Sequence, residues 1–109
     1  LAGDQVLREL AALVRPLVRA DQLFARIGGE ELALLLPGAP LAKAALFAEK
    51  VRARVEGHPF RFEGARLPVT VSVGVAELAG DDPDPDALVG RADARLYAAK
   101  GAGRNRVCA

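Results

Sequence analysis

The sequence predicts an α/β (α+β) domain in which helices flank a central, mostly antiparallel sheet. Segments with helical spacing of apolar residues alternate with short apolar runs bounded by glycine and proline. Their order is helix, strand pair, helix, strands, helix, which suggests helices packed on an antiparallel or mixed sheet. The length of 109 residues fits one domain with its own core and leaves no room for a second.

The first third of the chain predicts a helix followed by a hairpin. Apolar residues recur at helical spacing over residues 6–17, and Pro16 is expected to end or kink this helix one or two residues earlier. Two apolar runs, at 23–27 and 32–36, surround the sequence Gly28-Gly29-Glu30-Glu31. This pattern is typical of a β-hairpin with a glycine turn.

A second helix and further strands are predicted in the middle of the chain. Apolar residues on one face define a helix from about 41 to 56, with Gly57 as its C-cap. A short edge hairpin is expected at 60–67. Residues 69–76, VTVSVGVA, are rich in β-branched side chains and predict a strand.

The last helix is expected to follow an acidic, proline-broken loop at 81–86 and to run through Lys100. Asp84 or Asp86 is the expected N-cap, because a side-chain oxygen there accepts from the first backbone N–H groups. The chain opens on a helix, so a strand preceding Leu1 is expected to complete the sheet beneath it.

Composition limits the classes of function. The net charge of +1, from 15 basic and 14 acidic residues, gives no global reason to expect nucleic-acid binding. Cys108 is the only cysteine, which excludes an internal disulfide and favours a reducing cytosol; an extracytoplasmic protein without disulfides is the alternative. No apolar run approaches the ~20 residues of a membrane span, and residues 1–4 do not resemble a secretory signal.

The turn at 28–31 is the first of two segments that indicate a site. Paired glycines permit positive φ and let a ligand approach the backbone. Glu30 and Glu31 repel each other there, which a divalent cation relieves, and hard oxygen ligands suit Mg²⁺. An ordinary solvated turn with surface carboxylates is the alternative interpretation.

The second segment is the end of the last helix. Lys100 and Arg104 lie at the helix terminus and in the glycine-rich sequence that follows it, where two cations can grip a polyphosphate. The alternative is structural, because cations favour helix C-termini through the helix dipole and glycines commonly end helices.

Taken together, these segments resemble the GGDEF family of diguanylate cyclases. Four ordered motifs carry the resemblance, and they span essentially all 109 residues: the opening GDQVL, the hairpin RIGGEELALLLPG, the strand VTVSVGVA and the terminal ADARLYAAKGAGRNRV. The resemblance implies a ferredoxin-like fold, similar to the polymerase palm and the nucleotidyl cyclases. Residues 1–109 would then be a partial GGDEF domain whose first strand, with a metal-binding aspartate, precedes residue 1.

The resemblance also implies an activity. Each domain of the family binds one GTP, two domains meet head to tail as a homodimer, and cyclic di-GMP and pyrophosphate form. The reaction uses Mg²⁺ or Mn²⁺, and an upstream sensor or receiver domain is expected to control dimerisation. The domain is expected in the cytosol, without membrane contact of its own and without nucleic acid, although the parent protein can be membrane-anchored.

The hairpin residues take roles by their match to the family signature. Gly28 and Gly29 would bring the backbone close to the nucleotide. Glu30 would bind metal, and Glu31 would help to hold metal and ready the 3′-hydroxyl for attack. Arg26 is expected either to support the hairpin or to meet the partner domain.

Residues outside the hairpin match the rest of the nucleotide. Asp4 matches the acid that accepts hydrogen bonds from guanine. Lys100 and Arg104 match the cations that hold the β- and γ-phosphates. Asp93 and Tyr97 belong to the family's helix signature and are expected to cap, pack or bond between helices.

Three departures from the family pattern bear on activity. Leu32 replaces the phenylalanine that ends the signature and is expected to point into the core. The product-inhibition motif Arg-x-x-Asp begins here at Arg19 but ends in Gln22, which predicts weak or absent feedback inhibition. With the first strand and its aspartate absent, residues 1–109 are not expected to be a competent cyclase by themselves.

Two other functions compete with this interpretation. A degenerate GGDEF module would bind GTP or a protein partner without catalysis, and Leu32 and Gln22 favour it. A ferredoxin-like nucleic-acid binder would suit the architecture, but a basic, aromatic-bearing sheet surface is missing from the sequence.

Overall fold

A computed structural model describes residues 2–109, in which the chain forms two compact units. The first consists of Leu1–Gly38 with His58–Pro68, and the second of Ala39–Gly57 with Val69–Ala109. Each unit therefore combines segments that are distant in the sequence. The hairpin turn lies in the first unit, and the end of the last helix lies in the second.

The first unit begins with α1 (Ala2–Val14), which continues into the 3₁₀ helix η1 (Arg15–Leu17). Pro16 lies in the first turn of η1, so the expected break at this proline is confirmed. The apolar face of α1 supplies the most buried side chains of this helix, Leu10 at 6% and Val14 at 1% exposure. Helical spacing thus identified the face that is buried.

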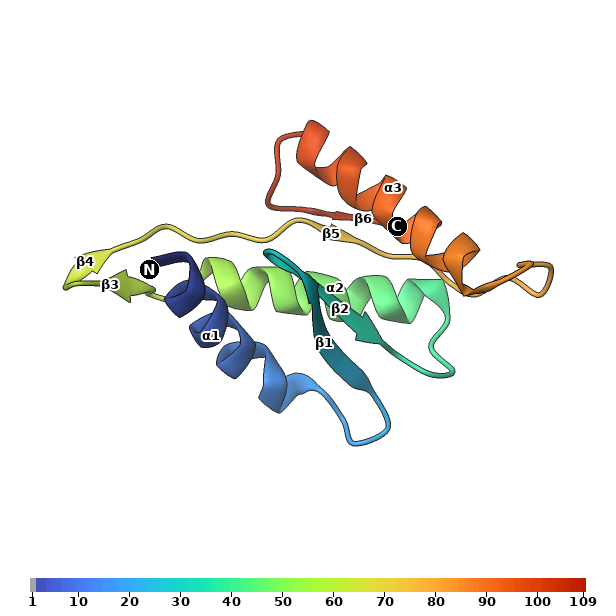
Figure 1. Ribbon diagram of the computed structural model, residues 1–109, viewed down its shortest axis with the longest axis horizontal. Coiled ribbons are helices and arrows are strands. Elements are labelled where there is room, and N and C mark those ends of the chain that lie inside the picture. Colours follow the sequence, from blue (N-terminus) through green and yellow to red (C-terminus); the bar gives the residue numbers. More distant parts are fainter. Residues whose placement is uncertain (1) are drawn as a thin grey trace. The chain divides into compact units, whose positions relative to one another are not determined.

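The hairpin of the first unit consists of β1 (Leu23–Gly28) and β2 (Glu31–Leu35), paired antiparallel from Leu23↔Leu35 onward. A second, smaller hairpin follows in β3 (Arg61–Phe62) and β4 (Ala65–Arg66). Both hairpins were predicted, the first from apolar runs around paired glycines and the second as a short hairpin at 60–67. Figure 1 shows the two hairpins as separate antiparallel pairs.

A polar contact ties α1 to the segment that precedes β3. Glu9 Oε2 on α1 lies 2.6 Å from His58 Nε2, and the His58 ring packs edge-on against Phe60 with ring centres 4.6 Å apart. Phe60 itself is fully buried. His58 lies in a loop, and through Glu9 it helps to fix the position of α1.

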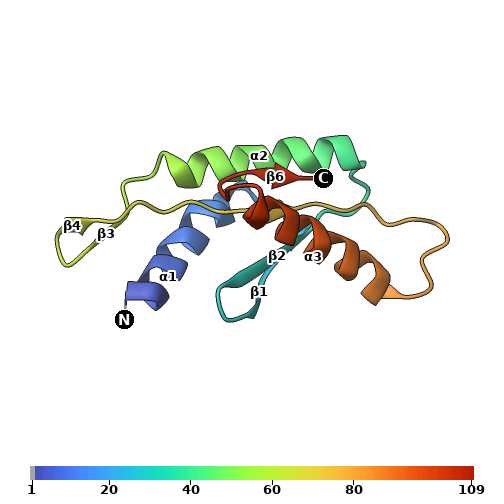
Figure 2. The same ribbon diagram turned by 90° about the horizontal axis from the view of Figure 1, so that it is seen from above.

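The second unit contains α2 (Leu41–Glu56), β5 (Val73–Gly74), α3 (Pro85–Gly101) and β6 (Val107–Cys108). β5 and β6 pair in parallel, as expected of two strands joined through a crossover helix. In both views the β5–β6 pair lies between α2 and α3 (Figures 1 and 2). The buried side chains of this unit are Ala48, Val51, Val55, Val75 and Ala99.

The boundaries of α2 and α3 follow local signals in the sequence. Gly57 is the C-cap of α2, as predicted. Of the two expected N-caps of α3, Asp84 takes the role: its Oδ1 accepts the backbone N–H of Ala87 at 3.1 Å. Asp86 lies in the first turn, where a negative charge complements the helix dipole.

The predicted strand at 69–76 is mostly wrong, because only Val73 and Gly74 pair with another strand in the described part of the chain. The expected central sheet likewise takes the form of three two-stranded sheets, two antiparallel and one parallel. Residues 69–72 have the composition of a strand, but a strand also needs a neighbouring strand to bond with.

Among residues 2–109, no helix combines the length and apolar content needed to cross a membrane.

A bidentate ion pair fastens the acidic loop to α3 and should make stability depend on pH. Arg91 donates to both carboxylate oxygens of Asp82, at 2.5 and 2.9 Å, and the Ala79 N–H donates to Oδ2 at 2.7 Å. The Arg91 hydrogen bond, followed by the Ala79 N–H, lowers the pKa of Asp82 from 3.8 to about 2. The ionised carboxylate is therefore favoured in the folded chain.

We expect the contribution of Asp82 to be complete above pH 4 and to be lost as the pH falls from about 4 to 2, because the depressed pKa belongs to the folded state. Urea unfolding between about pH 2 and about pH 5 measures the free energy of unfolding and its dependence on pH. Asp82→Asn should lower stability at pH 7 and flatten its decline in acid. An equally steep acid decline in Asp82→Asn would contradict the assignment.

Candidate nucleotide and metal site

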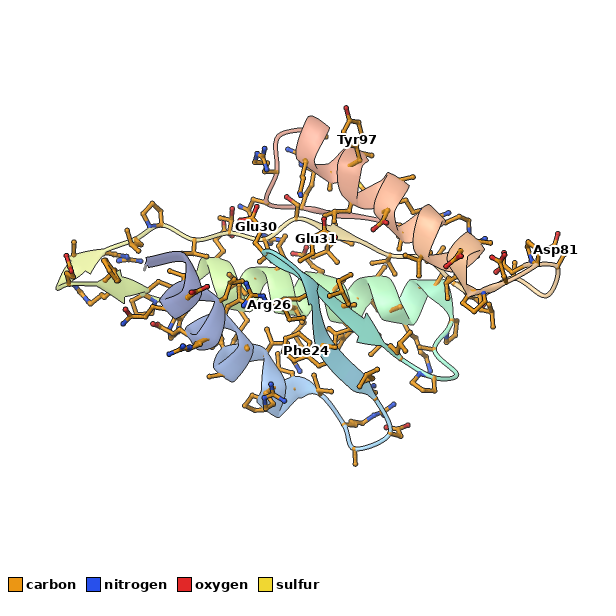
Figure 3. All side chains as sticks on the ribbon, viewed as in Figure 1. Phe24, Arg26, Glu30, Glu31, Asp81 and Tyr97 are labelled. Atoms are coloured by element: carbon orange, nitrogen blue, oxygen red, sulfur yellow. The ribbon has the colours of Figure 1, made fainter. Side chains whose placement is uncertain are left out.

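The tip of the β1–β2 hairpin presents two carboxylates on a glycine turn. Gly29 has a φ of +45°, a conformation that side chains with a Cβ disfavour. Arg26 Nε donates to the Gly29 carbonyl oxygen at 2.7 Å and so fixes the turn from within the hairpin. Figure 3 shows Glu30 and Glu31 at this tip, and both are exposed.

A bulge precedes the turn. Arg26 pairs with Leu32 and Gly28 with Glu31, so Ile27 is the extra residue on β1. A bulge twists a hairpin locally and re-aims the side chains beside it. The direction of the two carboxylates therefore depends on β1 as well as on the glycines.

The two glutamates suit a hard divalent cation. Mg²⁺ is commonly bound by one or two carboxylates together with substrate phosphates and water, so adjacent carboxylates at an exposed turn provide a fitting donor set. Within residues 2–109, no cluster of three or more His, Cys, Asp or Glu side chains could hold a metal ion alone. Glu30 and Glu31 alone would therefore supply only part of a metal ion's ligands.

A cleft of about 270 Å³ lies beside the hairpin, and α1, η1, β1 and β2 line it. Its lining residues are Asp4, Leu7, Arg8, Ala11, Arg15, Phe24, Ala25, Arg26 and Leu32. Asp4 Oδ1 lies 3.9 Å from Arg26 Nη2, and the Arg15 guanidinium lies 5.7 Å from the centre of the Phe24 ring. Arg26 therefore contacts both the glycine turn and Asp4, and it supports the hairpin, one of its two expected roles.

Leu32 lines this cleft and is only half-buried. The expectation that it points into the core is therefore only partly correct. A phenylalanine has a larger side chain than leucine, so the substitution bears on this cleft rather than on the buried core.

The second predicted cluster lies at the C-terminus of α3. Gly103, at a φ of +123°, follows the helix; its N–H bonds the Lys100 carbonyl, and the Arg104 N–H bonds the Ala99 carbonyl at 3.0 Å. These two bonds form a Schellman motif. Lys100 lies in the last turn of the helix, and the side chain of Arg104 is exposed just after it.

Sequence reasoning missed the residues that hold this loop. Asn105 Oδ1 accepts from Arg52 Nη1 at 2.8 Å, and Asn105 Nδ2 donates to Glu56 Oε2 at 2.5 Å. The Asn105 hydrogen bond, followed by that of Arg52, lowers the pKa of Glu56. An asparagine close to the end of a helix, a residue type that tolerates a left-handed backbone, was the available signal for its turn, but nothing local indicated its partners on α2.

The predicted site residues fall into two groups. Asp4, Gly28, Gly29, Glu30 and Glu31 belong to the first compact unit. Lys100 and Arg104 belong to the second. That the acidic and the cationic residues form one nucleotide-binding site stays a prediction.

Comparison with known proteins decides the family. The sequence profile of the diguanylate cyclase GGDEF domain matches residues 1–106. The chain belongs to the GGDEF domain family. This GGDEF domain is 46% identical over 107 residues to the response regulator PleD of Caulobacter vibrioides, covering 96% of the chain and 24% of PleD. The chain thus spans about a quarter of the length of that relative.

Solved structures agree with the family and with the predicted fold class. The GGDEF domain of DgcB from Caulobacter crescentus, in complex with c-di-GMP, matches with a TM-score of 0.90 and 33% identity, over 96% of this chain and 63% of that one. The active GGEEF domain of a diguanylate cyclase from Vibrio cholerae matches with a TM-score of 0.87 and 34% sequence identity. The match covers 98% of this chain and 67% of that one. The mixed α/β fold class is confirmed.

The segment that matches the GGDEF product-inhibition motif forms a closed turn. The Arg19 N–H donates to Gln22 Oε1 at 2.8 Å, and the Gln22 N–H donates to the Arg19 carbonyl at 3.0 Å. The Arg19 guanidinium lies 3.6 Å from Asp21. The glutamine side chain is thus engaged by its own turn.

One expectation for the helix signature of the GGDEF domain is wrong. Tyr97 was expected to cap, pack or bond between helices, but it is 80% exposed and projects away from α3 (Figure 3). Its position follows from helical spacing: Ala92, Leu96 and Ala99 face inward, and the residue after Leu96 faces away.

Proposed function

We propose that this GGDEF domain belongs to a diguanylate cyclase that joins two GTP molecules into cyclic di-GMP and releases pyrophosphate. The observation that carries the proposal is the pair of exposed carboxylates on the Gly29 turn, pinned by Arg26. Membership of the GGDEF family and the likeness to a domain crystallised with c-di-GMP support it.

In this proposal the hairpin handles the metal and the reacting hydroxyl. Glu30 and Glu31 hold Mg²⁺ or Mn²⁺, and Gly28 and Gly29 let the nucleotide approach the backbone. The ion, when held by these residues, would supply positive charge that neutralises the phosphates. Glu31 additionally readies the 3′-hydroxyl, which attacks the α-phosphate of the other GTP as pyrophosphate leaves.

The other residues recognise the two ends of GTP. Asp4, on the wall of the cleft, has a carboxylate that complements the N1–H and N2 amino donors of guanine. Lys100 and Arg104 bind the β- and γ-phosphates as a cationic pair. Positioning and charge neutralisation are the main tasks of a protein in phosphoryl transfer, and these residues provide both.

Turnover needs two such sites. The proposed reaction occurs across a head-to-tail homodimer, and an upstream sensor or receiver domain in the cytosol would control its assembly. The chain spans about a quarter of the length of PleD, so the activity is proposed for the full-length protein. The response-regulator relative is consistent with control by an additional domain.

A degenerate GGDEF module that binds GTP or a protein partner without catalysis is the second candidate. The smaller side chain of Leu32 at the cleft and the hydrogen-bonded Gln22 favour it. The test incubates the full-length protein with GTP and Mg²⁺ at concentrations that favour dimers, and follows pyrophosphate release and cyclic di-GMP by chromatography. Formation of product supports the cyclase, and GTP binding without product supports the degenerate module. If the protein neither binds GTP nor forms product, the proposed nucleotide site is wrong.

We further expect little feedback inhibition by cyclic di-GMP. The side-chain amide of Gln22 cannot offer the carboxylate that pairs with two guanine donors, and its oxygen already accepts the Arg19 N–H. Gln22→Asp should tighten product binding about tenfold or more, because a charged acceptor replaces a neutral one. Calorimetry with cyclic di-GMP measures this change. Micromolar binding by the unaltered protein that disappears in Arg19→Ala would contradict the expectation.

A further inference from the structure

The loop after α3 has an unfavourable backbone at the two residues that follow Gly103. Arg104 has a φ of 64° and Asn105 a φ of 47°, both in the left-handed region that disfavours residues with a Cβ. Two such residues in succession persist only where their surroundings hold them. The structure must therefore supply contacts that stabilise this conformation.

Those contacts come from α2. Arg52 and Glu56 bond the oxygen and the nitrogen of the Asn105 carboxamide at 2.8 and 2.5 Å, across separations of 53 and 49 residues. We call Arg52, Glu56 and Asn105 the α2–loop clasp. Both ends of the carboxamide are engaged, so the clasp fixes its orientation as well as its position.

The clasp is itself rigidly supported. Arg52 makes ion pairs with Glu49 at 2.6 Å and Glu56 at 3.1 Å, and its side chain is only 16% exposed. The hydrogen bonds to Glu49 and Glu56 raise the pKa of Arg52, and Arg52 lowers that of Glu49. Charged and mutually bonded side chains on one helix therefore form a firm anchor for the loop.

Arg104 lies between this anchor and the end of α3. Its N–H bonds the Ala99 carbonyl at 3.0 Å, and its carbonyl accepts from Arg106 Nε at 3.1 Å. Its backbone is thus bonded on both sides, whereas its side chain is exposed. This arrangement presents the guanidinium to solvent from a fixed point.

We propose that Arg52, Glu56 and Asn105 are positioning residues that hold Arg104 for the triphosphate of GTP. The inference rests on the proposed function and adds to it a support that lies on α2. A preorganised cation loses less freedom when it binds phosphate, so the clasp increases affinity for the β- and γ-phosphates without touching them.

The test compares nucleotides by calorimetry on the full-length protein with Mg²⁺. Asn105→Ala should weaken GTP binding about tenfold and leave GMP binding unchanged, because GMP lacks the phosphates assigned to Arg104. In an Arg104→Ala background, Asn105→Ala should have little further effect, since the clasp acts through Arg104. Hydrogen exchange at residues 103–106 should also rise in Asn105→Ala without any nucleotide.

Two further variants control for backbone strain. Glu63, in the β3–β4 turn, also has a positive φ of 51°, so Glu63→Ala introduces the same type of strain outside the clasp and should not change GTP binding. Asn105→Gly removes the side chain but suits a left-handed backbone, and it should still weaken GTP binding.

The outcomes distinguish failure of the clasp proposal from failure of the proposed GTP-binding function. Unchanged GTP affinity in Asn105→Ala, with the unaltered protein binding GTP, would overturn the clasp alone. Equal weakening of GTP and GMP would overturn it too, because the loss would then be general. If the unaltered protein bound no GTP, the proposed function would fail, and the role given to the clasp with it.

Discussion

Glu31→Ala should reduce cyclic di-GMP formation by the full-length protein by a factor of about 100 or more. Groups that stabilise charge or ready a nucleophile in the transition state typically contribute factors of this size. Glu31 begins β2 and pairs with Gly28 across the turn, so its carboxylate is carried by the hairpin rather than by a loose loop. The rate of pyrophosphate release with GTP and Mg²⁺ measures the effect.

Glu31→Gln and Glu63→Ala complete this experiment. The glutamine variant keeps the shape and removes the charge, so it should lose nearly as much activity as alanine if the carboxylate acts on metal and hydroxyl. Glu63 is an exposed glutamate in the other hairpin turn, and Glu63→Ala should retain activity. Substantial turnover in Glu31→Ala, with an unchanged circular dichroism spectrum, would remove Glu31 from the mechanism.

The sequence predicted the elements that are determined by near neighbours. Pro16 ends α1, Gly57 caps α2 and Asp84 caps α3, because each of these residues acts on the backbone within one helical turn. The β1–β2 hairpin follows equally from its paired glycines. The two main segments of candidate site residues, 28–31 and 100–104, were proposed on the same local basis, since each is short and continuous in sequence.

Features that depend on distant partners were not predictable in this way. Val69, Thr70 and Val71 are β-branched, but composition does not tell which strand they bond with, and the observed pairing begins only at Val73. Asn105 has its partners on α2, about fifty residues earlier, and no local pattern indicates them. Sequence reasoning therefore proposed Arg104 as a site residue but did not indicate the residues that contact its loop.

Gly74→Ala should destabilise the second compact unit by about 3 kcal/mol or more, because overpacking against a backbone cannot be relieved by rotating a side chain. A Cβ on Gly74 would collide with the Ala92 carbonyl oxygen and the Leu96 amide nitrogen. Both atoms belong to the backbone of α3, so the whole helix would have to move away from β5. Urea unfolding followed by circular dichroism measures the loss.

Gly90→Ala is the matched control, because Gly90 lies in the same helix with open space where a Cβ would go. Alanine there should raise stability by about 0.5–1 kcal/mol through its higher helix propensity. Opposite signs for the two substitutions would show that the close approach of α3 to β5 requires a glycine at position 74. Since α3 carries Lys100 and leads into Arg104, a shift of the helix should also weaken GTP binding. A Gly74→Ala variant as stable as the unaltered protein would contradict the packing of α3 on this strand.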